Sequence, residues 1–134
     1  MSPSSNELWA QTIAGSLRAA GASQVVFSPG SRSTPLVLAL DRTPGFTLWP
    51  AIDERSAAFF ALGQSKATSK PTILVCTSGT AGAHYLPALI EARLASIPLV
   101  VLTADRPWEL HGFGSPQTID QAELFGRHVL HCEM

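Results

Sequence analysis

Residues 72–76, with the sequence Thr-Ile-Leu-Val-Cys, place the strongest constraint on the fold of this chain. A strand with almost no polar residue must be buried on both faces, which is typical of a parallel sheet covered by helices on both sides. Further β-favouring runs lie at 24–27, 46–49 and 98–102, and helical patterns lie between the runs. This alternation predicts an α/β domain whose parallel strands are joined by right-handed crossovers.

Capping signals delimit the helices between these strands. Ser4 and Glu7 have the spacing of a capping box, which predicts a first helix that ends near Gly21. Asp53 is suited to cap the third helix. Pro87 lies inside the fourth helical pattern and is expected either to kink that helix or to mark its true start. After the first helix, the helical patterns cover 34–40, 54–68, 81–95 and 119–125.

Length and composition indicate how many domains the chain forms and what its surface contacts. A chain of 134 residues is long enough for one hydrophobic core, so residues 1–134 are expected to form a single domain. Charged residues make up 14% of the chain, whereas about a quarter is usual in soluble domains. Part of the surface is therefore expected to meet another domain or subunit, although a neutral surface rich in Ser, Thr and Gln would give the same composition.

The sequence gives no sign of a nucleic-acid or membrane partner. The formal net charge is −1, and no cluster of Lys and Arg stands out. No apolar run approaches the roughly 18 residues of a membrane span, and the N-terminus lacks the features of a signal peptide, so we expect a cytoplasmic protein. Cys76, Cys132 and the four histidines show no metal-ligand spacing, so we expect ordinary thiols and no metal ligands in this chain.

Four polar segments follow the predicted strands, at 28–35, 53–55, 77–80 and 103–107. Because the carboxyl ends of parallel strands meet at one edge of a sheet, these segments are expected to converge where open α/β sheets bind their ligands. The convergence would bring together the carboxylate of Glu54, two guanidinium groups and several hydroxyls. This set of groups favours a small anionic ligand.

Several familiar motifs are absent from the sequence. No G-x-G-x-x-G follows the first strand, there is no Walker lysine, and residues 76–80 lack the leading glycine of a G-x-S-x-G elbow. Simple dinucleotide binding and serine hydrolysis are therefore disfavoured. Glu54 taken alone also has a purely structural explanation, because the helix dipole stabilises an acidic residue in the first turn.

Two segments resemble the pyrimidine-binding domain of thiamine diphosphate enzymes in order and spacing. They are 53–63, which begins Asp-Glu-Arg-Ser-Ala-Ala, and 70–82, which ends Thr-Ser-Gly-Thr-Ala-Gly. Segments 28–36, 102–107 and 115–119 are further similar to one family in this group, the 2-succinyl-5-enolpyruvyl-6-hydroxy-3-cyclohexene-1-carboxylate synthases of menaquinone biosynthesis, or MenD family. The likeness covers nearly all of the chain but only the N-terminal part of such an enzyme. It implies a three-layer αβα domain of the thiamine diphosphate-binding fold, truncated at its C-terminus.

The resemblance implies a cofactor site in the loops. In these enzymes a glutamate at the position of Glu54 hydrogen-bonds the pyrimidine ring of thiamine diphosphate and shares a proton with it, which activates the cofactor. Gly79 and Thr80 are expected at a helix start, where backbone N–H groups and a hydroxyl could contact the cofactor, and Pro29 is expected to shape the opposing loop. The diphosphate and its Mg2+ or Mn2+ ion are held by a separate C-terminal domain, usually of the partner subunit. This chain alone is therefore expected to be inactive, and its parent to be a homo-oligomer.

The resemblance also implies the substrates. MenD-type enzymes are transferases that decarboxylate 2-oxoglutarate and add the resulting carbanion to isochorismate. Arg32 and Arg106 match residues of the substrate pocket and can grip carboxylates in a bidentate manner. Ser31 and Gln117 match polar residues of the same pocket, although each could simply cap its loop. Arg55 is expected to pair with a nearby acid.

Two other functions are compatible with the same features. The first is a sibling thiamine enzyme, such as an acetolactate synthase or a 2-oxoacid decarboxylase, whose small substrates need less carboxylate recognition than Arg32 and Arg106 offer. The second is a flavodoxin-like binding or assembly module without catalysis. That module would bind no thiamine diphosphate and would not depend on Glu54.

Overall fold

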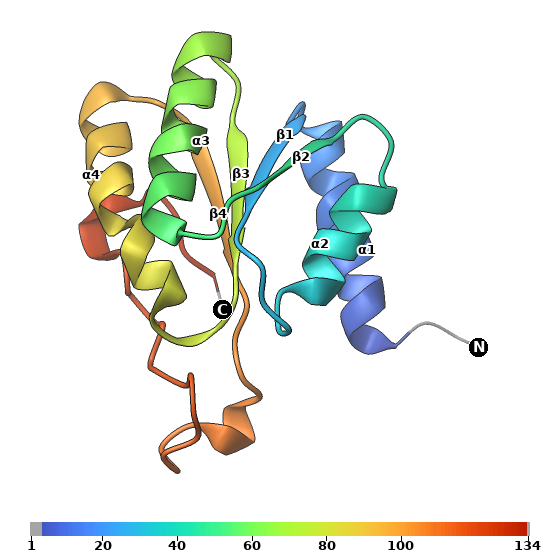
Figure 1. Ribbon diagram of the computed structural model, residues 1–134, viewed down its shortest axis with the longest axis vertical. Helices are drawn as coiled ribbons and strands as arrows, with labels where there is room; N and C mark the ends of the chain where they lie inside the picture. Colours follow the sequence, from blue (N-terminus) through green and yellow to red (C-terminus); the bar gives the residue numbers. More distant parts are fainter. Residues whose placement is uncertain (1–3, 134) are drawn as a thin grey trace.

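The computed structural model describes residues 4–133 and contains a four-stranded sheet with helices on both faces (Figure 1). The strands are β1 (Gln24–Phe27), β2 (Thr47–Pro50), β3 (Thr72–Cys76) and β4 (Leu99–Thr103). Their order in the sheet is β2-β1-β3-β4, and each neighbouring pair is parallel. The predicted three-layer α/β fold with a parallel sheet is therefore confirmed.

The α-helices are α1 (Ser5–Ala19), α2 (Thr34–Arg42), α3 (Glu54–Thr68) and α4 (Leu86–Ala95). Short 3-10 helices are η1 (Gly79–Tyr85), η2 (Trp108–Leu110) and η3 (Gly126–His128). Helices α1 and α2 cover one face of the sheet, and α3 and α4 cover the other (Figure 1). Within residues 4–133, every helix is too short or too polar to cross a bilayer.

The sheet divides the hydrophobic core into two halves, because side chains alternate between the faces along each strand. Val25, Ile73 and Val75 pack under α1 and α2. Val26, Leu74 and Cys76 pack under α3 and α4. All five residues of β3 are buried, as the unbroken apolar run predicts for a central strand.

Local signals set the ends of α1 and α3 where the sequence predicts them. The Ser4 side chain accepts a hydrogen bond from the backbone N–H of Glu7, and the Glu7 carboxylate accepts one from the backbone N–H of Ser4 at 2.7 Å. This is the predicted capping box. Asp53 caps α3, which begins at Glu54 as expected.

Two helical predictions need correction. The expected helix over 81–95 is η1 followed by α4, and Pro87 lies in the first turn of α4, where its missing N–H costs nothing. Pro87 therefore marks the true start of the helix. The expected helix over 119–125 is wrong, because Glu123 has a φ of 56° and cannot continue a right-handed helix. The second and fourth strands are shifted by one residue from the predicted runs.

Candidate functional site

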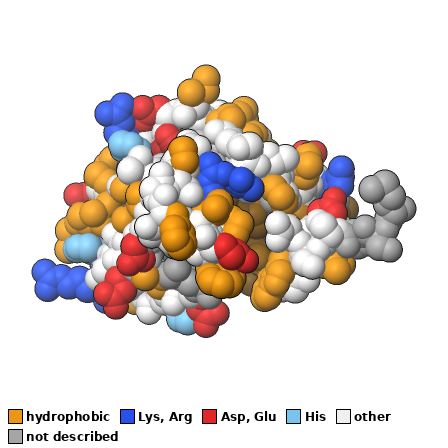
Figure 2. Space-filling model, turned by 90° about the horizontal axis from the view of Figure 1, so that it is seen from below, with side chains coloured by type: hydrophobic (Ala, Val, Ile, Leu, Met, Phe, Trp, Pro, Cys, Tyr) orange, Lys and Arg blue, Asp and Glu red, His pale blue; other side chains and the backbone are white. Residues whose placement is uncertain are grey.

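The carboxyl ends of β1 and β3 form the centre of the candidate site. These strands are neighbours, but the chain leaves β1 toward β2 and leaves β3 toward β4, so the two following loops diverge. A crevice at such a switch point is where open α/β sheets bind ligands. A Cβ atom at Gly30, in the first loop, would collide with the side chain of Thr77, in the second, so the loops touch at their base. Figure 2 shows this end of the molecule, where charged side chains of both signs lie among apolar ones.

Asp53 holds the start of α3 and pairs with Arg55. Asp53 Oδ1 accepts hydrogen bonds from the backbone N–H groups of Arg55 and Ser56 at 2.9 and 3.1 Å. Arg55 Nη2 lies 2.6 Å from Asp53 Oδ2, so Arg55 pairs with a nearby acid as predicted. Hydrogen bonding from the Arg55 side chain and from the Ser56 N–H holds the pKa of Asp53 well below its ordinary value.

Glu54 is the first residue of α3 and is half-buried. Among residues 4–133, no hydrogen bond or ion pair involves its carboxylate, since Arg55 is already bound to Asp53. Glu54 is therefore a carboxyl group at a strand-end crevice that is free to bind a ligand.

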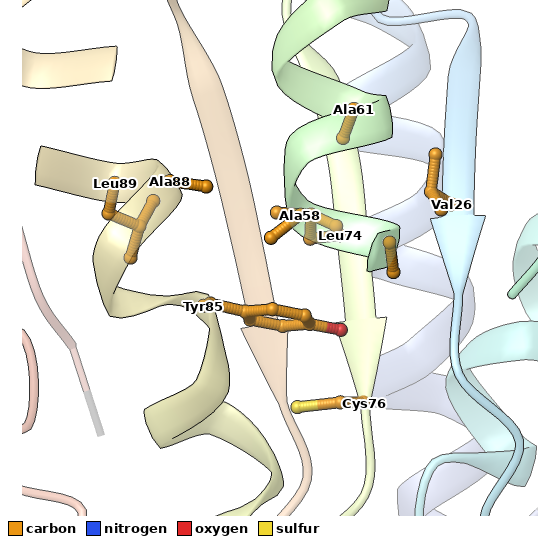
Figure 3. Packing of buried hydrophobic residues seen from close by; sticks show 9 residues of the cluster. Val26, Ala58, Ala61, Leu74, Cys76, Tyr85, Ala88 and Leu89 are labelled. Atoms are coloured by element: carbon orange, nitrogen blue, oxygen red, sulfur yellow. The ribbon is translucent and has the colours of Figure 1, made fainter. Parts of the chain in front are cut away.

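A buried polar cluster lies beside the start of α3. It consists of Ser28 at the end of β1, Cys76 at the end of β3 and Tyr85 at the end of η1, each with 0% exposure. The hydroxyl of Tyr85 is directed toward β3 and lies near Cys76 (Figure 3). Burial raises the pKa of Cys76 to about 12 and raises the pKa of Tyr85 further above its ordinary value, and the charge of Glu54 adds to both shifts. Both groups therefore stay protonated and neutral.

Sequence reasoning missed Tyr85. The signal was present, because Tyr85 begins an i, i+3, i+4, i+7 pattern that continues through Ala88, Leu89 and Ala92, and this pattern predicts a buried face. The interpretation of Cys76 as an ordinary thiol agrees with its burial and its protonated state.

The structure brings Gly79 and Gln117 together from distant parts of the sequence. Gly79 is buried with a φ of 78°, and a Cβ atom there would lie 3.0 Å from Cα of Gln117. Gln117 has a φ of 53° and an exposed side chain. Thr80 follows Gly79 in η1 and is exposed, and Pro29 is exposed in the loop after β1.

The two predicted arginines differ in their surroundings. Arg32 is exposed, beside Ser31, in the turn before α2. Arg106 is half-buried, and its Nε atom is buried without a hydrogen-bond partner among residues 4–133. Asp105 Oδ1 accepts a hydrogen bond of 2.7 Å from the backbone N–H of Arg106, and its Oδ2 lies 3.5 Å from His111 Nε2, so Asp105 holds this loop in place. In the described part of the chain, neither guanidinium group is paired with a carboxylate.

A groove of about 970 Å3 runs along the open edge of β4 and reaches Thr103 and Asp105 at the carboxyl end of that strand. Val100, Leu102 and Val129 are among its lining residues, whereas Glu54, Arg32 and Gly79 are not. Across residues 4–133, no three His, Cys, Asp or Glu side chains gather closely enough to hold a metal ion.

Comparison with known proteins shows that this chain is similar to three proteins named 2-succinyl-5-enolpyruvyl-6-hydroxy-3-cyclohexene-1-carboxylate synthase. The protein of Myxococcus xanthus is 56% identical over 124 residues, covering 92% of this chain and 21% of the relative. The protein of Chloroflexus aurantiacus is 58% identical over 121 residues, and that of Geobacillus kaustophilus 56% over 122 residues. These matches cover 90% and 91% of this chain and 21% of each relative.

The chain thus spans about a fifth of the length of the curated relatives it matches. The profile of the family described as "Thiamine pyrophosphate enzyme, N-terminal TPP binding domain" matches residues 9–124, which include all four strands and the loops at their carboxyl ends. The chain therefore belongs to the family of N-terminal domains with which thiamine pyrophosphate enzymes bind their cofactor.

Proposed function

We propose that this chain is the N-terminal domain of a thiamine diphosphate-dependent 2-succinyl-5-enolpyruvyl-6-hydroxy-3-cyclohexene-1-carboxylate synthase, a transferase of menaquinone or phylloquinone biosynthesis. The reaction decarboxylates 2-oxoglutarate and adds the resulting carbanion to isochorismate. The observation that carries this proposal is identity of 56% to 58%, over nine tenths of the chain, to synthases of that name. The sheet order alone would also suit a flavodoxin-like module, so the family match decides between them.

The crevice has groups that fit the pyrimidine end of the cofactor, which offers both donors and acceptors. Gly30 and Gly79 lack the Cβ atoms that would fill the space at the base of the loops. The buried hydroxyls of Ser28 and Tyr85 have no hydrogen-bond partner among residues 4–133. Buried polar atoms without partners are rare in folded proteins and suggest a ligand-binding role.

Four residues would hold the pyrimidine end of the cofactor, namely Pro29, Glu54, Gly79 and Thr80. When bound, thiamine diphosphate supplies the electron sink for decarboxylation. The task of Glu54 is to hold and exchange a proton at a carboxylate oxygen that faces the ring, since only a titratable group can act as an acid and then as a base. Glutamine could keep the hydrogen bond but could not exchange the proton.

The substrates are anionic, so their recognition needs cationic donors. Arg32 and Arg106 would bind the carboxylates of isochorismate and 2-oxoglutarate, because a guanidinium fork matches a carboxylate in geometry and charge. The buried, unpaired Nε atom of Arg106 supports this role. The exposed side chains of Ser31 and Gln117 would complete the pocket through hydrogen bonds to hydroxyl or carboxylate oxygens.

The rest of the site would come from elsewhere in the assembly. We assign the diphosphate and its Mg2+ or Mn2+ ion to residues outside this chain, and we propose that the whole enzyme is a homo-oligomer. Large apolar side chains around the start of α3 support a covering partner: Ile52 is 89% exposed, and Trp49 and Phe60, in edge contact at 5.7 Å between ring centroids, are 41% and 46% exposed. The isolated 134-residue chain should therefore show no turnover.

The test uses the full-length enzyme that carries this domain. Isochorismate and 2-oxoglutarate are supplied with and without thiamine diphosphate, and the product is followed by mass spectrometry. The substitution Glu54→Gln should reduce kcat by a factor of about 100 or more, because it removes the proton-exchanging group. The matched substitution Glu91→Gln, at an exposed position on α4, should leave the rate unchanged.

Other outcomes would contradict the proposal. Turnover of pyruvate in place of 2-oxoglutarate, with no use of isochorismate, would indicate a sibling thiamine enzyme. Failure to bind thiamine diphosphate would favour a non-catalytic module. A wild-type rate in Glu54→Gln would remove Glu54 from the mechanism.

A further inference from the structure

The segment that follows β4 folds back on Arg106 within five residues. Pro107 comes directly after Arg106, and a residue before proline is disfavoured in the helical region, so the chain leaves Arg106 in an extended direction. The N–H of Leu110 then donates to the carbonyl oxygen of Pro107 at 2.9 Å. The N–H of His111 donates to the carbonyl oxygen of Trp108 at 3.1 Å, which closes η2. This turn, beyond the carboxyl end of β4, brings the His111 side chain against the backbone of Arg106 (Figure 1).

Both backbone polar groups of Arg106 are held by neighbouring side chains. Its N–H donates to Asp105 Oδ1 at 2.7 Å, and its carbonyl oxygen lies 3.2 Å from His111 Nε2. A carbonyl oxygen can only accept a hydrogen bond, so His111 Nε2 is the donor. The same Nε2 atom lies 3.5 Å from Asp105 Oδ2, which links the two side chains. Three residues thus form a closed ring of polar contacts around the Arg106 backbone.

These polar contacts, rather than packing, hold the loop. The large apolar side chains of the same segment contribute little, because Trp108 and Phe113 are 79% and 80% exposed. The side chains of Asp105 and His111 are only 27% and 31% exposed, so water competes less for their hydrogen bonds than it would at the open surface. The conformation of Arg106 therefore depends on the two polar side chains beside it.

Arg106 is the residue whose placement matters in this loop. Its guanidinium group is proposed to bind a substrate carboxylate, and its Nε atom is buried without a partner among residues 4–133. An arginine side chain has many rotamers, so ordering it when a ligand binds costs conformational entropy. A backbone fixed at both its N–H and its carbonyl group sets the direction of the Cα–Cβ bond, and this limits the positions that the guanidinium group can reach.

We infer that His111 is a positioning residue for Arg106. Its Nε2–H holds the Arg106 carbonyl oxygen and, together with Asp105, fixes the backbone from which the guanidinium group reaches the anionic substrate. This inference rests on the proposed role of Arg106 in substrate binding. His111 does not touch the substrate and acts only through Arg106.

The test compares two replacements of His111 in the full-length holoenzyme. The amide nitrogen of glutamine can take the place of Nε2 and donate to the Arg106 carbonyl oxygen, whereas the shorter asparagine reaches only as far as Nδ1. His111→Asn should lower kcat/KM for isochorismate by about 3-fold to 10-fold, the loss expected for one hydrogen bond. His111→Gln should stay within about twofold of wild type. The Kd for thiamine diphosphate should be unchanged in both variants, because the proposed cofactor residues lie on other loops.

A double substitution tests whether His111 acts through Arg106. Arg106→Ala alone should lower kcat/KM for isochorismate, because it removes the guanidinium group. Adding His111→Asn to that variant should change kcat/KM by no more than about twofold, since the group that His111 positions is already gone. Additive losses would show that His111 affects the substrate by another route, which would overturn the inference.

Each contrary result has a distinct meaning. Wild-type kcat/KM in His111→Asn, alongside a clear loss in Arg106→Ala, would overturn the role of His111 and leave the proposed function intact. Equal losses in His111→Asn and His111→Gln, or weaker binding of thiamine diphosphate in His111→Asn, would point to a general disturbance of the loop and also overturn the inference. Wild-type kcat/KM in Arg106→Ala would remove Arg106 from the proposed pocket and the role of His111 with it.

Discussion

Gly79 lies directly against the backbone of Gln117, so that a methyl group on Gly79 would stand 3.0 Å from Cα of Gln117. The contact joins the loop after β3 to a segment nearly forty residues later in the chain. In the proposed site, Gly79 belongs to the loop that binds the cofactor, and Gln117 belongs to the segment that binds the substrate. Their contact therefore sets the spacing between the two binding regions.

The substitution Gly79→Ala should destabilise the domain by about 1–3 kcal/mol, because alanine is strained at positive φ and would also press on Gln117. Equilibrium urea denaturation measures this difference. Gly15→Ala is the control, since Gly15 lies within α1 and its Cβ would meet nothing within 4 Å. That change should stabilise the domain by roughly 0.5–1 kcal/mol, and equal destabilisation by both changes would contradict the prediction.

Asp53→Ala should lower the melting temperature by a few degrees, because it removes the side chain that caps α3 and binds Arg55. The effect should depend on pH. Since the folded-state pKa of Asp53 is lowered, its stabilisation is fully present above the ordinary value of 3.8 and is lost as the pH falls through the lower folded value. Thermal melts of both proteins should therefore differ at neutral pH and converge in strong acid. A constant difference at every pH would contradict this assignment.

The two cysteines should react very differently with an alkylating reagent such as iodoacetamide. Cys76 is buried and its pKa is raised to about 12, so almost no thiolate is available near neutral pH. Cys132 is exposed and should be labelled rapidly. Mass spectrometry after proteolysis locates the modification, and labelling in denaturant, where both should react, is the control. Rapid labelling of Cys76 in the native protein would show that the end of β3 opens.

Arg32→Ala and Arg106→Ala, made in the full-length enzyme, should each reduce kcat/KM for isochorismate by about 10-fold to 100-fold, because each removes a charged hydrogen bond to a carboxylate. Steady-state kinetics with varied isochorismate measures the change. The exposed Arg42, at the end of α2, provides a matched control whose replacement by alanine should have little effect. Unchanged kcat/KM in both site variants would refute the assignment of the substrate pocket.

Much of the fold was predictable because its signals are local. The capping box at Ser4, the cap at Asp53 and the apolar run of β3 act within a few residues, and the corresponding elements are confirmed. The predicted helix over 119–125 failed because tertiary contacts decide that segment. Gln121 Nε2 donates a hydrogen bond of 2.9 Å to the backbone oxygen of Ala104, seventeen residues earlier, and the backbone turns to allow it.

The site was predictable in part. Parallel strands bring their carboxyl ends to one edge, so the grouping of Glu54 with the loops after β1, β3 and β4 followed from the order of the elements. The contact between Gly79 and Gln117 could not be predicted, because it depends on the path of a loop without regular structure. The burial of Tyr85 follows from its helical pattern, whereas its position beside Cys76 depends on how η1 packs beneath α3.

The position of β1 and β3 in the middle of the sheet also bears on how such a domain can change over time. Strands β2 and β4 shield the central pair on either side, so a sheet that grows outward from β4 keeps the same immediate neighbours around the crevice. Strands added beyond β4 could therefore accumulate without changing the order of the four strands whose loops carry the site. The arrangement separates the part of the architecture that is free to diversify from the part that must stay constant.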